Sequence, residues 1–355
     1  MKVAVLKPDH LGDLVLAAPA LTALQRRFSD LTLLCHPESA ALAQHLFPRL
    51  ALRPVLLPHL DRARRLDLRA RPLAALRGQF DLLICLRWDD HVRVQLDDSG
   101  LSYHAARTDS LDVHVAVEQR EVIAPWTGPY DLLTSYRYAF HPPVQQRQLG
   151  SVGVCIAAGH PLNAWPLNHW LELAQRLQRR GLSIVFIGGP AETTRLRVLA
   201  EAMATSTDHS LRVLIGTSDF ARFLHDVADT VDLVIASDSG TAHLASLVRP
   251  VLSLFGGSPW RRFAPLGQDN AVITRQLPCS PCPQFDRTLL NTCQSRECLV
   301  NLSPEQVESC LDAYLDGKAH VRPRLVHGAW LARSPWETCS SHSTRRTGAG
   351  HLVTA

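Results

Sequence analysis

Residues 232–257 constrain the fold of this chain more than any other stretch. An apolar run rich in β-branched residues, 233–236, is followed by a tight polar segment, a short helical pattern and a second apolar run at 251–255. This order predicts a strand, a turn, a helix and a parallel strand, the repeating unit of a doubly wound α/β sheet. The turn would bring the free N–H groups of a helix N-terminus to the carboxyl edge of the sheet, where such folds hold anionic ligands.

Polar side chains gather in that turn. It consists of Asp238, Ser239, Gly240 and Thr241, and His243 follows within the predicted helix. A carboxylate, two hydroxyls and an imidazole at one sheet edge predict that this segment binds a phosphorylated ligand.

The alternation of strand and helix patterns continues through two series, so we expect two domains. A chain of 355 residues also exceeds one ordinary core. We place the first domain at residues 1–145 and the second at 150–317, separated by a polar, proline-bearing stretch at 141–148. Residues 318–355 are polar and rich in turn-forming residues, and we expect a disordered tail.

The apolar periodicity predicts parallel sheets with helices on both faces. The first series predicts strands at 2–7, 31–35, 54–57 and 81–86, with a helix ending near residue 28. Residues 87–125 carry no readable period. The second series predicts strands at 152–157, 183–187, 212–215, 233–236 and 251–255, and helices at 167–180, 191–204, 219–227, 241–247 and 303–315.

Composition excludes several classes of protein. No apolar run approaches the roughly 18 residues that span a bilayer. The run at 14–24 follows Asp9 and Asp13 rather than basic residues, so it predicts an amphipathic helix and not a signal peptide. Without an export signal, the nine cysteines are expected to be reduced thiols in a cytoplasm.

The net charge of +4 is unevenly distributed. Residues 49–77 contain eight arginines against two aspartates, namely Arg49, Arg53, Arg62, Arg64, Arg65, Arg69, Arg71 and Arg77 against Asp61 and Asp67. The stretch is either a solvated helix face with a charged loop, or a basic surface for an acidic acceptor or an anionic membrane face. Few aromatic residues interleave with these arginines, which argues against nucleic acid as a partner.

The N-terminal turn offers a candidate catalytic base. Asp13 falls at the start of the first helix, where the helix dipole favours its ionised form, so it could accept a proton from an acceptor hydroxyl. The alternative is an ordinary first-turn carboxylate, worth about 1 kcal/mol. Gly12 would allow close backbone approach or an unusual φ. The earlier Lys7 lies on the same acceptor side.

Two further segments end strands of the second series. Gly159 follows one strand and precedes Trp165-Pro166, which fixes the entry into a long helix. Glu192 follows the next strand after Gly188-Gly189-Pro190-Ala191, where it could receive a donor group of a ribose or base. A first-turn glutamate is also an ordinary helix feature.

Together these elements resemble glycosyltransferase family 9, the ADP-heptose:lipopolysaccharide heptosyltransferases, over roughly residues 1–316. The matching residues are Lys7 with Leu11-Gly12-Asp13 and Pro19-Ala20-Leu21, Gly159 with Trp165-Pro166, Gly188 to Glu192, Asp238-Ser239-Gly240 with His243-Leu244-Ala245, and Leu254-Phe255-Gly256. Their order and spacing are specific for the family but not for a substrate.

The resemblance implies a GT-B fold, two Rossmann-like domains with parallel sheets facing across a cleft. It implies that the first domain binds the acceptor, a lipopolysaccharide core or similar glycan, and the second binds the nucleotide-sugar donor, with ADP-heptose favoured. Inversion at the anomeric carbon without an obligate metal or cofactor is expected. The family's base falls on Asp13, its donor triplet on Asp238, Ser239 and Gly240, its phosphate-side histidine on His243, and its nucleoside carboxylate on Glu192.

One position departs from the family pattern. Asn163 stands where a lysine usually meets donor phosphates, and it offers a hydrogen bond but no charge. Arg261 or Arg262 could compensate. The alternatives are a different nucleotide-sugar, or a nucleotide-sugar-binding protein with weak or lost catalysis. An oxidoreductase is disfavoured because no Gly-x-Gly-x-x-Gly follows the first strand.

Two clusters outside these motifs have competing interpretations. The spacing of Cys279, Cys282, Cys293 and Cys298 is compatible with tetrahedral zinc, although plain thiols are the favoured interpretation. The pairs Asp89-Asp90 and Asp97-Asp98 could suggest a metal-diphosphate clamp. Their place in the first domain favours solvated loop carboxylates instead.

Overall fold

The computed structural model describes residues 1–61, 67, 69–105, 111–130, 132, 149–204, 211–215, 219–267, 269–282, 293, 295–317 and 324–333. The chain divides into two compact units, with the boundary between residues 136 and 137. The predicted linker at 141–148, three of the arginines (Arg62, Arg64 and Arg65) and residues 334–355 of the predicted tail lie outside the described residues.

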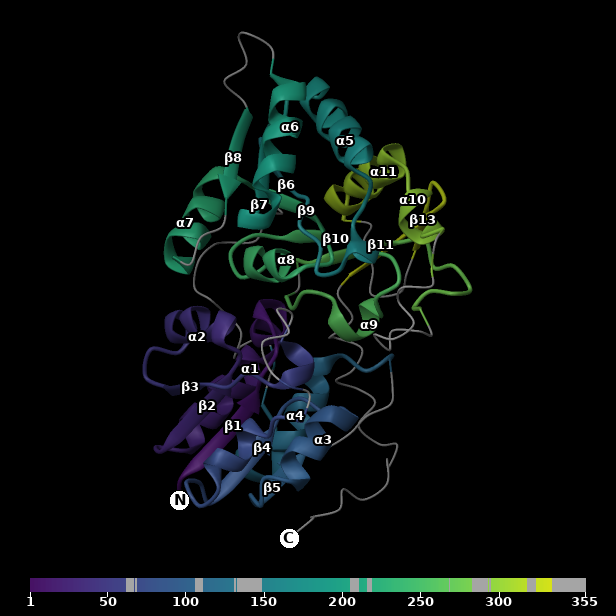
Figure 1. Ribbon diagram of the computed structural model, residues 1–355. Helices are drawn as coiled ribbons and strands as arrows, with labels where there is room; N and C mark the ends of the chain where they lie inside the picture. The colour runs from purple at the N-terminus through teal and green to yellow at the C-terminus, as the bar shows by residue number, and fades with distance from the viewer. Residues whose placement is uncertain are drawn as a thin grey trace. The chain divides into compact units, whose positions relative to one another are not determined.

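The first unit is a parallel five-stranded sheet in the order β3-β2-β1-β4-β5 (Figure 1). The chain builds β1, β2 and β3 outward on one side, then returns to place β4 and β5 on the other. The order therefore reverses between β1 and β4, which makes this the topological switch point of the sheet. The elements are β1 (Val3–Lys7), α1 (Leu11–Arg27), β2 (Leu31–Cys35), α2 (Ala40–Leu46), β3 (Ala51–Pro54), β4 (Leu82–Cys85), α3 (Asp90–Asp97), β5 (Tyr103–Ala105) and α4 (Val115–Thr127).

Both faces of this sheet are covered, so its central strands are apolar throughout. All five residues of β1 are buried, and its Ala4 and Leu6 pack in a cluster with α3 and with side chains from residues 55–76. Helix α1 packs against α4. The helix predicted at 14–24 is present, but over these residues it is buried on most of its circumference, because only Thr22 among them is polar. The exposed Arg26 and Arg27 follow at the end of α1.

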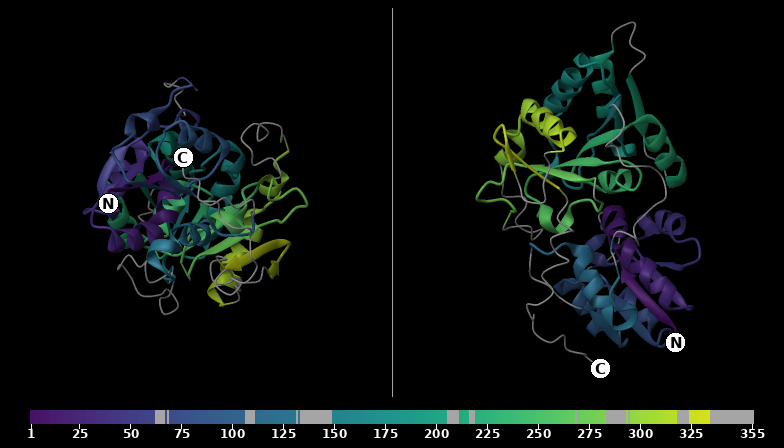
Figure 2. Two further views of the ribbon diagram at one scale, coloured as in Figure 1. Left: turned by 90° about the horizontal axis from the view of Figure 1, so that it is seen from below. Right: turned by 180° about the vertical axis from the view of Figure 1, so that it is seen from behind.

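The second unit is an eight-stranded sheet in the order β12-β13-β11-β10-β9-β6-β7-β8. Figure 2 gives two further views of the ribbon. The strands of the sheet are parallel except β13, which runs antiparallel to β11 and β12. The order reverses between β6 and β9, the switch point of this sheet. The strands are β6 (Ser151–Cys155), β7 (Ser183–Gly188), β8 (Leu211–Ile215), β9 (Leu233–Ser237), β10 (Val251–Phe255), β11 (Ala271–Thr274), β12 (Arg324–Val326) and β13 (Ala329–Arg333).

Helices cover both faces of the second sheet. They are α5 (Leu167–Arg179), α6 (Thr193–Met203), α7 (Phe220–Thr230), α8 (Gly240–Ala245), α9 (Trp260–Phe263), α10 (Glu297–Val300) and α11 (Pro304–Leu315). Helices α5, α6 and α11 share one core with the sheet, and α5 contributes Trp170, Leu173 and Leu177 to it. Helix α8 contacts β9 and β10 and packs against α7. Ser303 and Gln306 form a capping box at the start of α11, as the sequence suggested.

Most strands of the second unit lie within two residues of their predicted positions, but the chain beyond residue 317 differs from the prediction. Strands β12 and β13 form part of the sheet, whereas the sequence predicted a disordered tail from 318 onward. Four apolar residues stand in a row in β13, and its Ala329 and Leu331 are buried in the core, so pairing with β11 removes apolar surface from water. The second unit therefore extends at least to residue 333.

In the first unit, the strand predicted at 54–57 lies at 51–54, and the unassigned stretch 87–125 contains α3, β5 and α4. Among the described residues, no helix combines the length and hydrophobicity that a membrane-spanning segment needs.

Candidate functional site

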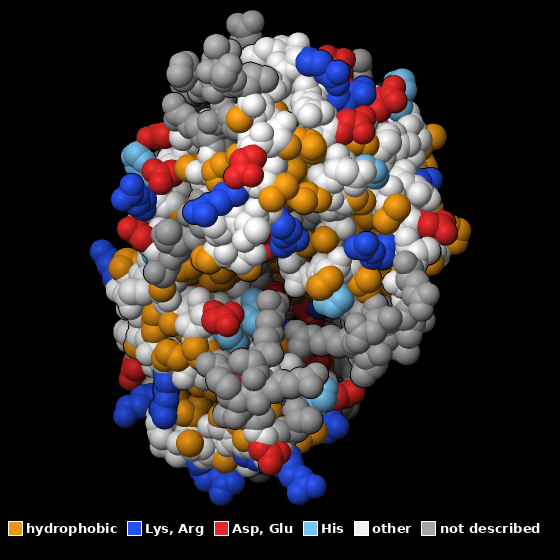
Figure 3. Space-filling model, turned by 45° about the horizontal axis from the view of Figure 1, so that its top comes forward, with side chains coloured by type: hydrophobic (Ala, Val, Ile, Leu, Met, Phe, Trp, Pro, Cys, Tyr) orange, Lys and Arg blue, Asp and Glu red, His pale blue; other side chains and the backbone are white. Residues whose placement is uncertain are grey.

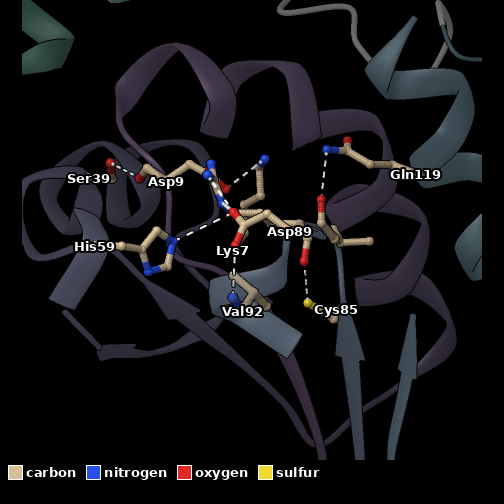
Figure 4. A network of polar contacts seen from close by, with 10 residues as sticks. Lys7, Asp9, Ser39, His59, Cys85, Asp89, Val92 and Gln119 are labelled. Atoms are coloured by element: carbon tan, nitrogen blue, oxygen red, sulfur yellow. Dashed lines mark hydrogen bonds and ion pairs between the residues drawn. The ribbon is translucent and has the colours of Figure 1, made fainter. Parts of the chain in front are cut away.

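The first unit carries a network of charged side chains at its switch point (Figure 4). Lys7 ends β1, and Asp9 lies two residues beyond it. Arg87 and Asp89 follow the end of β4, the strand that pairs with β1. Because parallel neighbours end at the same edge, these four side chains meet although about 80 residues separate them.

Asp9 is at the centre of this network. Its side chain is 2% exposed, its Oδ2 lies 2.9 Å from Lys7 Nζ, and its Oδ1 accepts a hydrogen bond from Arg87 Nη1. Burial alone would raise the pKa of the Asp9 carboxyl, but the charges of Arg87 and Lys7 outweigh burial and hold it well below its usual range. Asp9 is therefore a carboxylate held between two cations.

Arg87 extends the network to a second carboxylate. Its Nε donates to Asp89 Oδ2 at 2.7 Å, and Asp89 also caps α3 by accepting from the Val92 amide at 2.8 Å. His59 Nε2 lies 3.6 Å from the same Asp89 oxygen. Burial alone would raise the pKa of the Asp89 carboxyl. The contact with His59 and the charge of Arg87 outweigh burial and hold this pKa well below its usual range.

The candidate base Asp13 lies beside this network. It is half-buried in the first turn of α1, as predicted, and its charge contributes to raising the pKa of Arg87. One expectation for its neighbours changes. Gly12 has helical backbone inside α1 and no positive φ, because α1 begins at Leu11 and includes it. Lys7 is 3% exposed and pairs with Asp9, so its ammonium group is part of the buried network, and its role on the acceptor side stays a prediction.

Sequence reasoning missed Asp9, His59, Arg87 and Asp89. The pairs Asp89-Asp90 and Asp97-Asp98 were interpreted as solvated loop carboxylates. They lie at the two ends of α3 and not in a loop, but Asp90, Asp97 and Asp98 are exposed as expected, whereas Asp89 is half-buried. Asp97 binds Arg93 and the Tyr103 hydroxyl, and Asp98 binds Arg71. The available signal was position: Asp9 and Arg87 each follow an apolar strand, the place where α/β sheets carry ligands.

The second unit carries a separate cluster at its own switch point. The Gly159 amide, after β6, donates to the Asp238 carbonyl, after β9, at 3.1 Å. Asn163 Nδ2 donates to Asp238 Oδ2 at 3.2 Å and to Ser258 Oγ at 2.7 Å. Three loops that follow β6, β9 and β10 are thus tied together by one amide. Gly159 and Asp238 therefore lie side by side at this edge of the sheet.

The predicted phosphate-binding turn has the expected local structure. Ser239 is the N-cap of α8, and its Oγ accepts from the Ala242 amide at 3.2 Å. Gly240 and Thr241 form the first turn of α8 and are half-buried. His243 lies in the same helix and is 5% exposed, so its ring is largely covered by protein. Its predicted contact with donor phosphates stays a prediction.

Glu192 ends the turn after β7. Its Oε2 accepts from the Gly189 amide at 2.9 Å, and its Oε1 lies 3.2 Å from Arg195 Nη2. These contacts are those of a local cap and an i,i+3 ion pair. Each oxygen has a second lone pair, so the predicted contact of Glu192 with a nucleoside stays open.

Cations approach the loop that carries Asn163. Arg296 Nη1 donates to the Pro161 carbonyl at 3.1 Å. The candidates named from the sequence, Arg261 and Arg262, lie on α9, and their guanidinium groups stack on Trp260 at 4.6 Å and Phe263 at 5.5 Å. Sequence reasoning missed Arg296, a cation that bonds directly to this loop.

The four cysteines whose spacing suggested zinc, Cys279, Cys282, Cys293 and Cys298, lie near one another without forming a compact ligand set. Burial, followed by the charges of Cys293, Cys279 and Cys282, raises the pKa of Cys298 to about 11. Cys282 donates its amide to the Gly257 carbonyl at 2.7 Å, which fastens this loop beside β10. Among the described side chains, no three of these sulfurs lie within ligand distance of one another.

The arginines of residues 49–77 are partly engaged within the first unit. Arg71 pairs with Asp98, and Arg77 Nε donates to the Ser99 carbonyl at 3.2 Å. Arg49 and Arg69 are exposed. On the face that Figure 3 presents, basic side chains are interspersed with acidic and hydrophobic ones and form no single large patch.

Comparison with known proteins relates this chain to one family. The model of glycosyltransferase family 9 (heptosyltransferase) matches residues 117–292. Lipopolysaccharide heptosyltransferase 1 of Pseudomonas aeruginosa is 28% identical over 163 residues, which cover 42% of this chain and 44% of that protein. Lipooligosaccharide heptosyltransferase 2 of Campylobacter jejuni is 21% identical over 321 residues, 86% of this chain and 96% of that protein.

The solved structures include E. coli heptosyltransferase WaaC with ADP, which superposes with a TM-score of 0.60 at 18% identity and covers 88% of this chain and 100% of that chain. At this identity the likeness concerns the fold alone. The predicted GT-B fold class, with two parallel-sheet α/β domains, is confirmed.

Proposed function

Because this chain belongs to glycosyltransferase family 9, the heptosyltransferase family, we propose that it transfers a heptose, or a related sugar, from an ADP-sugar to a lipopolysaccharide core or a similar glycan. The relatives are named for heptosyl transfer to lipopolysaccharide or lipooligosaccharide, and one solved structure contains ADP. The second unit would bind the donor and the first unit the acceptor.

The observation that carries the proposal is the cluster at the second switch point. The hydrogen bonds from Gly159 and Asn163 to Asp238, and from Asn163 to Ser258, hold three strand-end loops in one arrangement at the carboxyl edge of the sheet. That edge is where open α/β sheets bind nucleotides. The N–H groups at the start of α8 and the ring of His243 would stabilise the charge that develops on the leaving diphosphate.

In this proposal Asp13 accepts the proton of the acceptor hydroxyl. The neighbouring Arg87 favours the ionised carboxylate, the form that a base requires. The new bond to the anomeric carbon forms as the bond to the diphosphate breaks on the opposite side, so the product would have inverted configuration. This displacement needs no metal, and metal independence is part of the proposal.

The test uses the full chain with ADP-heptose and a panel of glycan acceptors, and measures release of ADP. Asp13→Ala should lower kcat by roughly 10²–10⁴-fold and leave the donor Kd unchanged. Asp90→Ala removes a carboxylate that is 76% exposed and should leave kcat unchanged. Full turnover by Asp13→Ala would show that Asp13 is not the base. NMR of the product anomer tests the proposed inversion, and turnover in the presence of a chelator tests the proposed metal independence.

Asn163 favours a second candidate, a protein that binds a nucleotide-sugar with weak or lost catalysis. Its amide is committed to Asp238 and Ser258 and brings no positive charge to the donor edge. Donor binding by calorimetry without turnover on any acceptor of the panel would select this candidate. Turnover with a GDP- or UDP-sugar would select a different donor.

A glycolipid acceptor would place the protein at an anionic membrane face. Of the described arginines of residues 49–77, the exposed Arg49 and Arg69 are the candidates for that contact. We expect the protein to sediment with anionic vesicles, and we expect less of it to sediment at raised salt. Arg49→Glu and Arg69→Glu should each reduce the bound fraction.

A further inference from the structure

We propose that His10, His36 and Glu38 form a binding site for a divalent first-row transition-metal cation, apart from the proposed transfer chemistry. One potential ligand atom from each side chain lies within 4.8 Å of the other two. No other three His, Cys, Asp or Glu side chains of the described residues meet this condition. The site belongs to the first unit, where the loops after β1 and β2 lie side by side.

The distances fit shared coordination of one ion. Glu38 Oε2 lies 3.6 Å from His10 Nδ1 and 4.0 Å from His36 Nδ1. The two rings are 4.6 Å apart between centroids, with their planes tilted by 57°. Ligand atoms bound tetrahedrally to zinc at about 2.1 Å lie roughly 3.4 Å apart. A movement of Glu38, which is 63% exposed, would shorten its distances to the two imidazole nitrogens.

The protein already holds the two imidazoles in place. His36 follows β2 and is 1% exposed, and His10 is the residue before the first turn of α1. Ser39 Oγ donates to the Asp9 carbonyl at 3.0 Å, which ties the loop after β2 to the loop after β1. Two rings fixed by the fold and one adjustable carboxylate reduce the ordering cost of binding a metal.

The protonation state at His36 also suits a metal. Its Nδ1 accepts a hydrogen bond from the Glu38 amide at 3.2 Å, so this nitrogen presents its lone pair toward Glu38. A metal ligand needs the same unprotonated nitrogen. A bound cation would replace this one hydrogen bond.

The donor set selects the class of cation. Two imidazoles and one carboxylate are the ligands of many zinc sites that keep an open position for water. Imidazole also suits nickel, copper and iron, whereas magnesium and calcium prefer all-oxygen sets. We therefore expect Zn²⁺ and Ni²⁺ to bind and Mg²⁺ not to bind.

The experiment is calorimetric titration of the full chain with ZnCl₂ at neutral pH, repeated with MgCl₂. Glu38→Gln and His10→Ala should each weaken zinc binding by at least about tenfold, since even loss of a group behind a ligand costs that much. His225→Ala, which removes a histidine that is 72% exposed in the second unit, should leave it unchanged. Acidic pH should weaken binding as the imidazoles take up protons.

Circular dichroism checks that each variant is folded, and the exposed Glu38 gives a variant whose fold is secure. Absence of zinc binding by the natural chain would overturn the proposal. Unchanged zinc affinity in both Glu38→Gln and His10→Ala would also overturn it, and would assign the metal to other ligands, such as the thiols of the second unit. Neither result depends on transferase activity.

Discussion

Replacing Asp9 by asparagine tests the charged network of the first unit directly. The substitution preserves the shape of the side chain but removes the charge that lies between Lys7 and Arg87. Lys7 is 3% exposed, and Arg87 is 24% exposed and retains Asp89 as a second partner. The variant therefore leaves the buried ammonium group of Lys7 without its carboxylate partner. The guanidinium of Arg87 loses one carboxylate partner and keeps Asp89.

The size of the effect follows from burial. Removing one partner of a buried ion pair costs about 3–5 kcal/mol, because the remaining charge stays buried without compensation. Asparagine can still accept a hydrogen bond, so the lower end, about 3 kcal/mol, is expected. For a domain of this size, such a loss lowers the Tm by roughly 10 °C.

Differential scanning calorimetry is the suitable assay because the two units can unfold in separate transitions. Asp9→Asn should lower the transition of the first unit and leave that of the second unchanged. The matched control is Asp90→Asn, whose side chain is 76% exposed and should change stability by less than about 0.5 kcal/mol. Equal shifts in the two variants would refute the argument that Asp9 stabilises the fold through buried pairing.

The same variant carries a pH signature. The folded pKa of Asp9 is lowered, so its contribution is present above the unfolded value of about 3.9 and is lost as pH falls toward the folded value. The stability difference between the natural chain and Asp9→Asn should be constant near neutrality and shrink below about pH 4. A difference that grows on acidification would contradict the assigned sign.

Two further outcomes follow from packing in the second unit. Gly256→Ala should destabilise this unit by about 1–3 kcal/mol in urea unfolding, because a Cβ there would lie 2.7 Å from Leu299 Cγ. Gly257→Ala, whose nearest contact would be 3.4 Å, should cost much less. A comparable loss in both would contradict this. Burial raises the pKa of the Cys155 thiol to about 12, so a thiol reagent at neutral pH should label exposed Cys279 in the folded protein and Cys155 only after unfolding. Labelling at equal rates would contradict the burial.

Local pattern was sufficient for much of this protein. The alternation of apolar runs and helical periods located strands β6 to β10 of the second unit, and the polar turn after β9 was correctly placed at the start of α8. Asp13 was correctly placed in the first turn of α1. These features depend on neighbours in sequence, through strand periodicity and helix capping, so the sequence alone determines them.

Local pattern did not predict every element correctly. Strands β12 and β13 are short, and they are held by pairing, β13 with β11 and the edge strand β12 with β13, so a polar context concealed them. Helix α1 was predicted to be amphipathic, yet over residues 14–24 it is buried on most of its circumference, and α4 packs against it. In both cases burial against a distant segment stabilises the element.

Strand order was decided only by the tertiary structure. Asp9 meets Arg87 because β4 pairs with β1 and not with β3, which precedes it in the chain. In the same way Asn163 meets Asp238 because β9 returns to lie beside β6. No local period encodes which strands become neighbours, since that choice minimises the exposed apolar surface of the whole sheet and its helices. The residue types at the two sites are therefore properties of the sequence, while their partners are properties of the fold.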